Sequence, residues 1–170
     1  ITDCIFEENT AINRSDSYRS GGGAIYSNGS NYNLSNTGNY LIIDRCVFRE
    51  NVSRGESGAL GGAIDLMSSA RITNSLFDGN KVSITNDGGF IAGGAIYAGA
   101  LGRFNGFNEV GDVIEIINNT IINNEATNNN GFVSSAGIFL DQGSETSSFW
   151  VFNNIIFYNN SQRTVGSYMD

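Results

Sequence analysis

The sequence predicts an all-β protein, a parallel β-helix of about five coils in a single domain over residues 1–170. Three observations support this prediction. Short phrases recur with variable spacers, no segment keeps a helical period, and runs rich in β-branched residues precede Asn-containing corners. Variable spacing suits a solenoid, because a long loop can leave one coil without disturbing its neighbours.

Two phrases recur along the chain. The phrase Gly-Gly-Ala-Ile begins at Gly22, Gly61 and Gly93, with a degraded copy over Ser135–Ile138. The phrase Phe-x-x-Asn begins at Phe6, Phe48, Phe77 and Phe157, with a weaker copy over Ile122–Glu125. Recurring phrases of this kind indicate stacked copies of one unit.

One coil can be followed through residues 113–140. Strand-like runs over Val113–Ile117, Thr120–Ile122 and Ala136–Leu140 are separated by an Asn corner and by a polar loop over 123–134. We therefore expect three short strands per coil.

Stacking places each residue over its equivalent in the next coil, about 4.8 Å away. An internal ladder on the second strand is expected to contain Phe6, Phe48, Phe77, Ile122 and Phe157. A second internal ladder is expected to contain Ile25, Ile64, Ile96 and Ile138. The expected corner ladder contains Asp3, Arg45, Asn74, Asn119 and Asn154.

Composition excludes several classes of protein. The net charge is −8, and the basic residues are scattered singly, which argues against nucleic-acid binding and against attachment to anionic membranes. No apolar stretch is long enough to insert in a membrane. The chain begins at Ile1, part-way through a repeat, so we expect it to be a piece of something longer.

The paired phrases resemble the repeats of the polymorphic outer membrane proteins and related autotransporter-passenger adhesins. The resemblance covers most of the chain, with departures at Ser135–Gly137 and Glu125 and with few cysteines. It implies a right-handed parallel β-helix displayed at a cell surface, with adhesion rather than catalysis as its role.

Cys4 and Cys46 each lie two residues before a phenylalanine of the second phrase, so they should stack on adjacent coils. A separation near 4.8 Å is within disulfide range, and a bridge would suit an oxidising compartment. Two free thiols that pack as small apolar residues are the other interpretation, and the sequence favours it.

Strand alternation predicts an outward apolar stripe beside the internal phenylalanine ladder. Such a stripe could form a lateral interface with another rod or domain. Its expected members are Ile5, Val47, Leu76, Ile121 and Ile156.

On the third strand, Tyr26, Asp65, Tyr97 and Phe139 should form an outward ladder. Tyr26, Tyr97 and Phe139 are candidate ligand-binding residues, since aromatic rings beside a carboxylate can stack on sugars. Asp65 and Asp141 are weak catalytic candidates, because glycosidases need two carboxylates about 5–10 Å apart. Solvated surface carboxylates are the alternative interpretation.

No cofactor is expected. With two Cys and no His, a zinc site is excluded. Ca²⁺ binding is conceivable at Asn86-Asp87 or at Asn108-Glu109 with Asp112, although neither has the spacing of a known calcium loop.

The sequence thus favours a secreted or cell-surface β-helix with a structural or adhesive role, as a passenger stalk or assembly unit. Its expected partners are a host or surface glycan or protein, neighbouring domains, or other copies of itself. Binding is expected through the long loops and the exposed aromatic residues. The alternative is a carbohydrate-active domain, either a polysaccharide hydrolase or lyase or a glycan-binding module.

Overall fold

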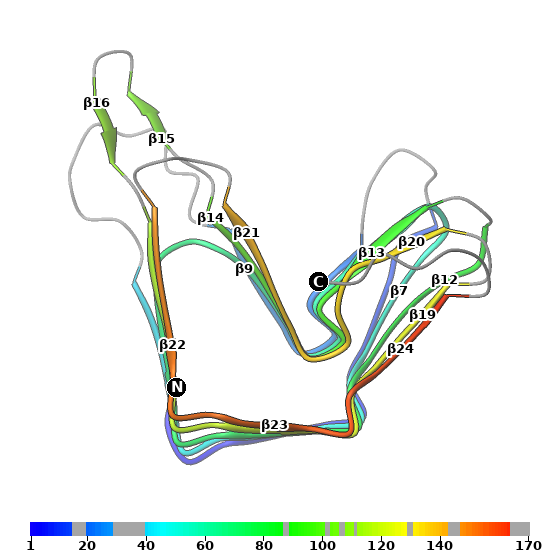
Figure 1. Ribbon diagram of the computed structural model, residues 1–170, viewed down its shortest axis with the longest axis horizontal. Helices are drawn as coiled ribbons and strands as arrows, with labels where there is room; N and C mark the ends of the chain where they lie inside the picture. The colour runs from blue at the N-terminus through cyan, green and yellow to red at the C-terminus, as the bar shows by residue number, and fades with distance from the viewer. Residues whose placement is uncertain are drawn as a thin grey trace.

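A parallel β-helix is confirmed by the computed structural model, which describes residues 1–14, 20–28, 40–86, 89–100, 103–105, 108–110, 112–128, 131–142 and 147–163. These residues form strands and no helix, and therefore contain no helix that could cross a membrane. Except for one antiparallel hairpin, the strands form five parallel sheets that run the length of the stack (Figure 1).

Each coil passes through the sheets in the order A, B, C, D and E. Sheet A contains β5 (Leu41–Asp44), β10 (Ala70–Thr73), β17 (Val113–Ile117) and β22 (Ser148–Phe152). Sheet B contains β1 (Ile5–Glu7), β6 (Val47–Arg49), β11 (Leu76–Asp78), β18 (Thr120–Ile122) and β23 (Ile155–Phe157). Sheet C contains β2 (Thr10–Ile12), β7 (Val52–Gly55), β12 (Lys81–Ile84), β19 (Glu125–Asn128) and β24 (Asn160–Arg163).

The remaining two sheets form the arms of each coil. Sheet D contains β3 (Ser20–Gly21), β8 (Gly58–Leu60), β13 (Phe90–Ala92) and β20 (Phe132–Val133). Sheet E contains β4 (Ile25–Asn28), β9 (Ile64–Met67), β14 (Ile96–Ala100) and β21 (Ile138–Gln142). The hairpin of β15 (Arg103–Asn105) and β16 (Asn108–Val110) projects beyond sheet E (Figure 1).

Each full coil therefore has five short strands rather than the three expected. The stretch 123–134 was expected to be a polar loop, yet it holds β19 and β20. Small or polar side chains such as Ser53 and Ala126 face inward from sheet C, while Lys81 and Glu125 face outward. A strand of this composition resembles a loop, because its inward positions are not strongly apolar.

The outline of a coil is folded in on itself (Figure 1). Sheets A, B and C form three sides, and sheets D and E turn back between them as a V. The largest apolar cluster includes Ile43, Phe48, Phe77 and Ile96, from sheets A, B and E. A second cluster, which includes Val82 and Ile91, lies between sheets C and D.

The Gly-Gly-Ala-Ile phrase makes the tight turn at the point of the V. Gly61 has a φ of +53°, in the left-handed region that glycine adopts easily. A Cβ on the next residue, Gly62, would lie 1.9 Å from the carbonyl oxygen of Gly94 and 2.7 Å from the backbone of Lys81. The second glycine is thus required by close backbone packing against sheet C, where the coil is narrowest.

The internal phenylalanine ladder is confirmed for the first three coils. The ring centroids of Phe6 and Phe48 are 4.8 Å apart, and those of Phe48 and Phe77 are also 4.8 Å apart, with the planes nearly parallel. In the last two coils the expected register is wrong by one residue. Phe77 pairs with Ile121, which pairs with Ile156, so Ile122 and Phe157 lie on the outer face.

The same one-residue shift moves the corner ladder. Left-handed φ values occur at Asp3, Arg45 and Asn74, as expected, but then at Asn118 and Asn153. Asn119 and Asn154 instead continue the column of Ser75, whose N–H donates to Asn119 Oδ1 at 2.9 Å. Consecutive asparagines at 118–119 and 153–154 made both alignments plausible in the sequence.

A ladder of asparagines, fully buried at its three middle members, runs inside the corner between sheets B and C. Its members are Asn9, Asn51, Asn80, Asn124 and Asn159. In each step the backbone N–H and Nδ2 of one asparagine donate to Oδ1 of the next, at 2.8–3.1 Å. The ladder explains the last residue of the Phe-x-x-Asn phrase in the first three coils, because it satisfies polar groups that would otherwise be buried unpaired.

Candidate functional site

The outer face of sheet B carries a column that is aliphatic in every coil except the fourth. The expected members Ile5, Val47 and Leu76 are in register there. Ile121 and Ile156 are not, because they lie in the internal column, where Ile121 is fully buried. Their places on the outer face are taken by the residue before each, so that the observed column is Ile5, Val47, Leu76, Thr120 and Ile155.

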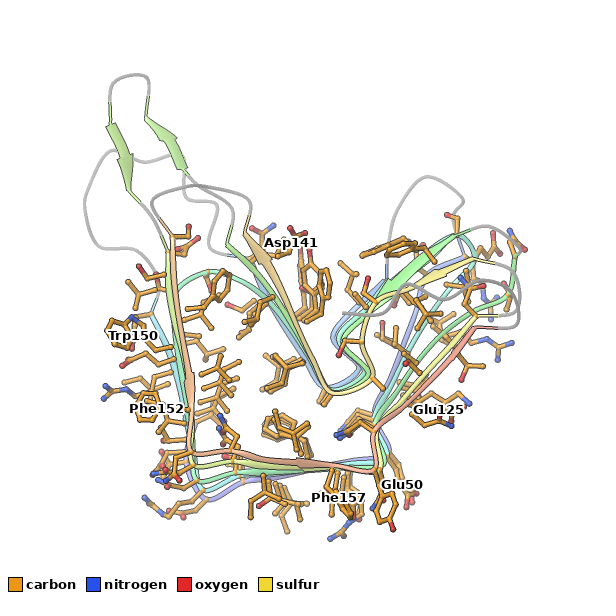
Figure 2. The ribbon with its side chains drawn as sticks, viewed as in Figure 1. Glu50, Glu125, Asp141, Trp150, Phe152 and Phe157 are labelled. Carbon is orange, nitrogen blue, oxygen red and sulfur yellow. The ribbon has the colours of Figure 1, made fainter. Side chains whose placement is uncertain are left out.

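The fifth coil adds a group of exposed aromatic side chains, of which Phe157 was expected inside the stack and the others were not singled out in the sequence. Trp150 and Phe152 lie outside sheet A, and Phe157 lies outside sheet B (Figure 2). Each of the three is more than half exposed, and Tyr158 is 75% exposed. Because side chains alternate along a strand, the pattern of β22 could have identified Trp150 and Phe152 as outward residues from the sequence.

The expected ladder on sheet E has the predicted register but not the predicted exposure. Tyr26, Asp65, Tyr97 and Phe139 pair in that order. Tyr26 is 55% exposed, whereas Asp65 and Tyr97 are each 2% exposed. The prediction of an exposed ladder is wrong for the middle two, because the V folds sheet D over this face of sheet E.

The contacts inside the V are close. A Cβ on Gly21 of sheet D would lie 2.2 Å from Oδ2 of Asp65, so the carboxylate packs directly on that glycine. Tyr97 packs in an apolar cluster with Leu60 and Ala92. Neither the buried ring of Tyr97 nor the carboxylate of Asp65 is available to stack on or bind a sugar.

A cleft of about 660 Å³ lies at the end of the V in the fourth coil. Phe90, Phe132 and Phe139 line it, together with Ser134 and Ser135. The Phe90 ring is 5.7 Å from that of Phe132 and 6.0 Å from that of Phe139. Of the three candidate ligand-binding residues, Phe139 alone is among the residues that line this cleft.

Phe90 and Phe132 were missed in the sequence, although a signal exists. Each lies three residues before the first position of the turn phrase, at Gly93 and Ser135. A repeated phenylalanine at a constant offset from the turn predicts a shared face in the stack.

The two candidate catalytic carboxylates are not brought together as a pair. Asp65 pairs with Tyr97, and Asp141 pairs with Gly99, two residues further along the same strand. Asp141 is therefore two strands across and two residues along from Asp65, which places their Cα atoms about 12 Å apart. Tyr97 lies between them, and its hydroxyl donates to Oδ2 of Asp141 at 2.6 Å. Asp141 itself is exposed on the side of sheet E that faces the V (Figure 2).

Cys4 and Cys46 are free thiols on adjacent coils, just before β1 and β6. Cys4 is exposed and donates to the carbonyl of Thr2, whereas Cys46 is buried and donates to the carbonyl of Asp44. Of the two interpretations, the unbonded pair describes this structure. The next residue in the column is Ser75, whose hydroxyl accepts the N–H of Cys46, which fits a column of small side chains.

Ion pairs on the outer surface link successive coils. Arg71 donates from Nε and Nη2 to the two carboxylate oxygens of Glu115, at 2.8 and 2.9 Å, and Tyr40 donates to the same carboxylate. These hydrogen bonds, that from Arg71 first, lower the pKa of Glu115. Burial, with the bond to Glu115, raises the pKa of Tyr40. Such pairs connect neighbouring coils at the surface.

Within the described ranges, no three His, Cys, Asp or Glu side chains gather as metal ligands. Of the calcium candidates, Asp87 and the side chains of 108 and 109 lie outside the described residues. Asp112 is buried, and Ser69 donates to its Oδ1 at 3.0 Å. Asp112 therefore has a structural role at the start of sheet A.

The candidate sites are therefore the outer face of sheet B, the aromatic residues of the fifth coil and the cleft at the end of the V. Comparison with protein-family models, with characterised proteins and with solved structures finds no match to this chain.

Proposed function

We propose that this protein is a structural or adhesive module of a secreted or cell-surface protein, which attaches through its outer faces and performs no turnover. The observation that supports the proposal is the aliphatic column on sheet B, which ends beside the exposed aromatic residues of the fifth coil. A row of outward apolar side chains that continues into exposed aromatic residues is a candidate contact surface. The resemblance to passenger adhesins points in the same direction.

The size of this face indicates the kind of contact. Five strands of three residues cover roughly 24 by 10 Å. That is far below the ~800 Å² per partner of a standard stable interface. Sheet B alone therefore supports a weak contact, which becomes strong when a partner also covers the fifth-coil aromatic residues or when many copies act together.

The first test is an assay for binding and turnover on the same samples. We expect the purified chain to bind members of a glycan or matrix-protein array and to release no reducing ends from a panel of polysaccharides. Release of reducing sugar that disappears in Asp65→Asn or Asp141→Asn would overturn the proposal.

The second test locates the contact surface. Leu76→Glu places a charge in the middle of the sheet B column, so we expect it to weaken binding at least tenfold without lowering the melting temperature. Thr10→Glu, an exposed position on sheet C, is the matched control and should leave binding unchanged. Equal loss in both variants would show that sheet B is not the contact.

A glycan-binding module is the second candidate function, favoured by the cleft of the fourth coil. Its three phenylalanine rings offer faces for a sugar, and Asp141 could accept hydrogen bonds from hydroxyl groups nearby. Phe132→Ala, at a 44% exposed position, tests it. Loss of glycan binding in this variant, with binding retained in Leu76→Glu, would assign recognition to the cleft.

A further inference from the structure

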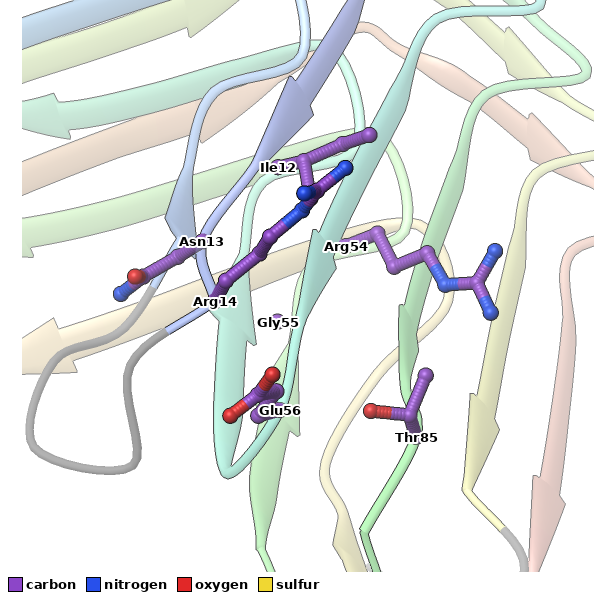
Figure 3. A pocket seen from close by; sticks show the side chains of 7 residues that line it. All are labelled: Ile12, Asn13, Arg14, Arg54, Gly55, Glu56 and Thr85. Carbon is purple, nitrogen blue, oxygen red and sulfur yellow. The ribbon is translucent and has the colours of Figure 1, made fainter.

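A hollow of about 240 Å³ lies at the ends of the sheet C strands in the first three coils, and none of its lining residues lines the cleft or belongs to sheet B (Figure 3). Arg14, Arg54, Glu56 and Thr85 provide its functional groups. The volume is below the ~300 Å³ of pockets for drug-sized ligands, so it suits a small group or part of a longer chain.

The two arginines differ from the other cations of known environment. Of the six Lys and Arg side chains that the structure describes, Arg45, Arg49, Arg71 and Lys81 form ion pairs with carboxylates. Within the same part of the chain, Arg14 and Arg54 form no ion pair or hydrogen bond through their side chains, and both are exposed. The hollow thus has two arginines against one carboxylate, that of Glu56, and this local excess of positive charge in a protein of net charge −8 makes it a candidate site for an anionic ligand.

The strand register sets the spacing of the two cations. Ile12 pairs with Arg54, and the N–H of Asn13 donates to the Arg54 carbonyl at 2.9 Å. Arg14 is thus one coil and two residues from Arg54, about 8 Å between Cα atoms. In Figure 3 the Arg54 side chain extends toward the side of Thr85, whereas Arg14 turns back toward Ile12.

This divergence decides the type of ligand. In Figure 3 the two guanidinium groups do not converge on one point, which favours a chain with repeated acidic groups over a single small anion. Glu56 would repel a bare anion, whereas it can accept hydrogen bonds from hydroxyl groups, as can Thr85. We propose that the hollow on sheet C binds a segment of an acidic glycan, with its carboxylate or sulfate groups on Arg14 and Arg54 and its hydroxyls on Glu56 and Thr85.

The proposal is tested by calorimetry on the full chain with four probes: a hyaluronan tetrasaccharide, a heparin tetrasaccharide, a neutral chitin tetrasaccharide and inorganic sulfate. We expect at least one acidic tetrasaccharide to bind, with an affinity that falls as salt rises. Binding of the hyaluronan tetrasaccharide would show that carboxylates suffice, whereas binding of the heparin tetrasaccharide alone would show that sulfate groups are required. Arg14→Ala and Arg54→Ala should each weaken this binding about tenfold, the scale of a lost charge-assisted hydrogen bond.

Arg49→Ala is the matched control, since it removes the same charge from an exposed arginine on sheet B. It should change the dissociation constant by less than about twofold, because its charge is outside the hollow. The proposal is overturned if neither acidic tetrasaccharide binds, if the neutral tetrasaccharide or sulfate binds equally well, or if Arg49→Ala loses as much affinity as the other two. Leu76→Glu should leave this binding intact, so the test is independent of the function proposed for sheet B.

Discussion

At the scale of single residues, the two glycines of the turn phrase have different physical roles. The first adopts a left-handed φ, and the second leaves room for the backbone of the neighbouring coil. Gly79 also has a left-handed φ, of +67°, but its surroundings are open. In other coils the equivalent corner holds Glu8, Glu50 and Asn123, so a side chain is accepted there.

This contrast predicts opposite outcomes for two glycine substitutions. Gly62→Ala should lower the free energy of unfolding by at least about 3 kcal/mol, because its Cβ would meet backbone that cannot move away. Gly79→Asn should change it by less than about 1 kcal/mol, since asparagine tolerates this φ and the space is open. Urea unfolding measures both, and a small effect at Gly62 would contradict the close packing at the turn.

The asparagine ladder gives a second residue-scale prediction. Asn80 is fully buried and accepts two hydrogen bonds from Asn51, while its Nδ2 donates to Phe48 O and Asn124 Oδ1. Asn80→Ala leaves several of these partners buried and unpaired, so we expect a loss of about 3 kcal/mol or more in unfolding free energy.

Asn9→Ala is the control for the ladder. Asn9 is exposed at the first step, and its backbone N–H can still donate to Asn51. The loss there should be below about 1 kcal/mol. Equal losses in urea unfolding at Asn9 and Asn80 would show that the cost does not arise from buried unpaired groups.

At the scale of elements, sheet B combines an internal column that holds the fold with an external column available for contact. The two columns alternate along each strand, so a one-residue shift exchanges core and surface. β18 is the informative strand, because Ile121 and Ile122 have the same side chain on opposite faces.

Ile121→Ser and Ile122→Ser therefore test the register directly. Ile121 is fully buried, so we expect its replacement to cost about 3 kcal/mol or more in unfolding free energy. Ile122 is half-buried on the outer face, and its replacement should cost about 1 kcal/mol or less. A larger loss of unfolding free energy in Ile122→Ser than in Ile121→Ser would support the register first expected from the sequence.

At the scale of the whole molecule, charged pairs join the first coil to the second and the third to the fourth, while the fifth is aromatic on its outer face. Hydrogen bonds from arginine and threonine side chains lower the pKa of several carboxyls. For Asp3 the largest cause is the bond from Arg45, for Asp44 the bond from Thr73, and for Glu125 the bond from Thr127. All of these groups are on or near the surface, so each contribution is modest.

These lowered pKa values predict how stability varies with pH. A carboxyl whose pKa is lower in the folded state binds protons more readily when unfolded, so it stabilises the fold above its ordinary pKa of 3.8 for Asp or 4.5 for Glu. That stability is lost as the pH falls through the folded-state values. We expect the melting temperature to be nearly level from pH 7 to 5 and to drop below about pH 4.5.

Glu115→Gln provides the check on this prediction. It removes one of the groups whose pKa is lowered, so the drop between pH 4.5 and 3 should be smaller than in the unaltered chain. A melting temperature that rises as the pH falls from 5 to 3 would contradict the role of these carboxylates.

The sequence predicted more of the fold than of the candidate sites. Recurring phrases identified the parallel stack and the phenylalanine column in three coils, since repetition at this level reflects in-register pairing. They did not resolve consecutive asparagines such as Asn118 and Asn119, or distinguish Ile121 from Ile122, because neighbouring residues of the same type fit either register. The strands of sheet C were missed for a related reason, their inward residues being small or polar.

By itself, the sequence determined that equivalent residues stack in successive coils, because a short repeated phrase can satisfy the same backbone geometry in each coil. Only the tertiary structure decided which outward residues remain exposed. Sheets D and E fold against each other and bury Asp65 and Tyr97, whereas Arg14 and Arg54 remain exposed and line one hollow on sheet C. Exposure depends on how distant strands of one coil close around each other, and no local pattern in the chain contains that information.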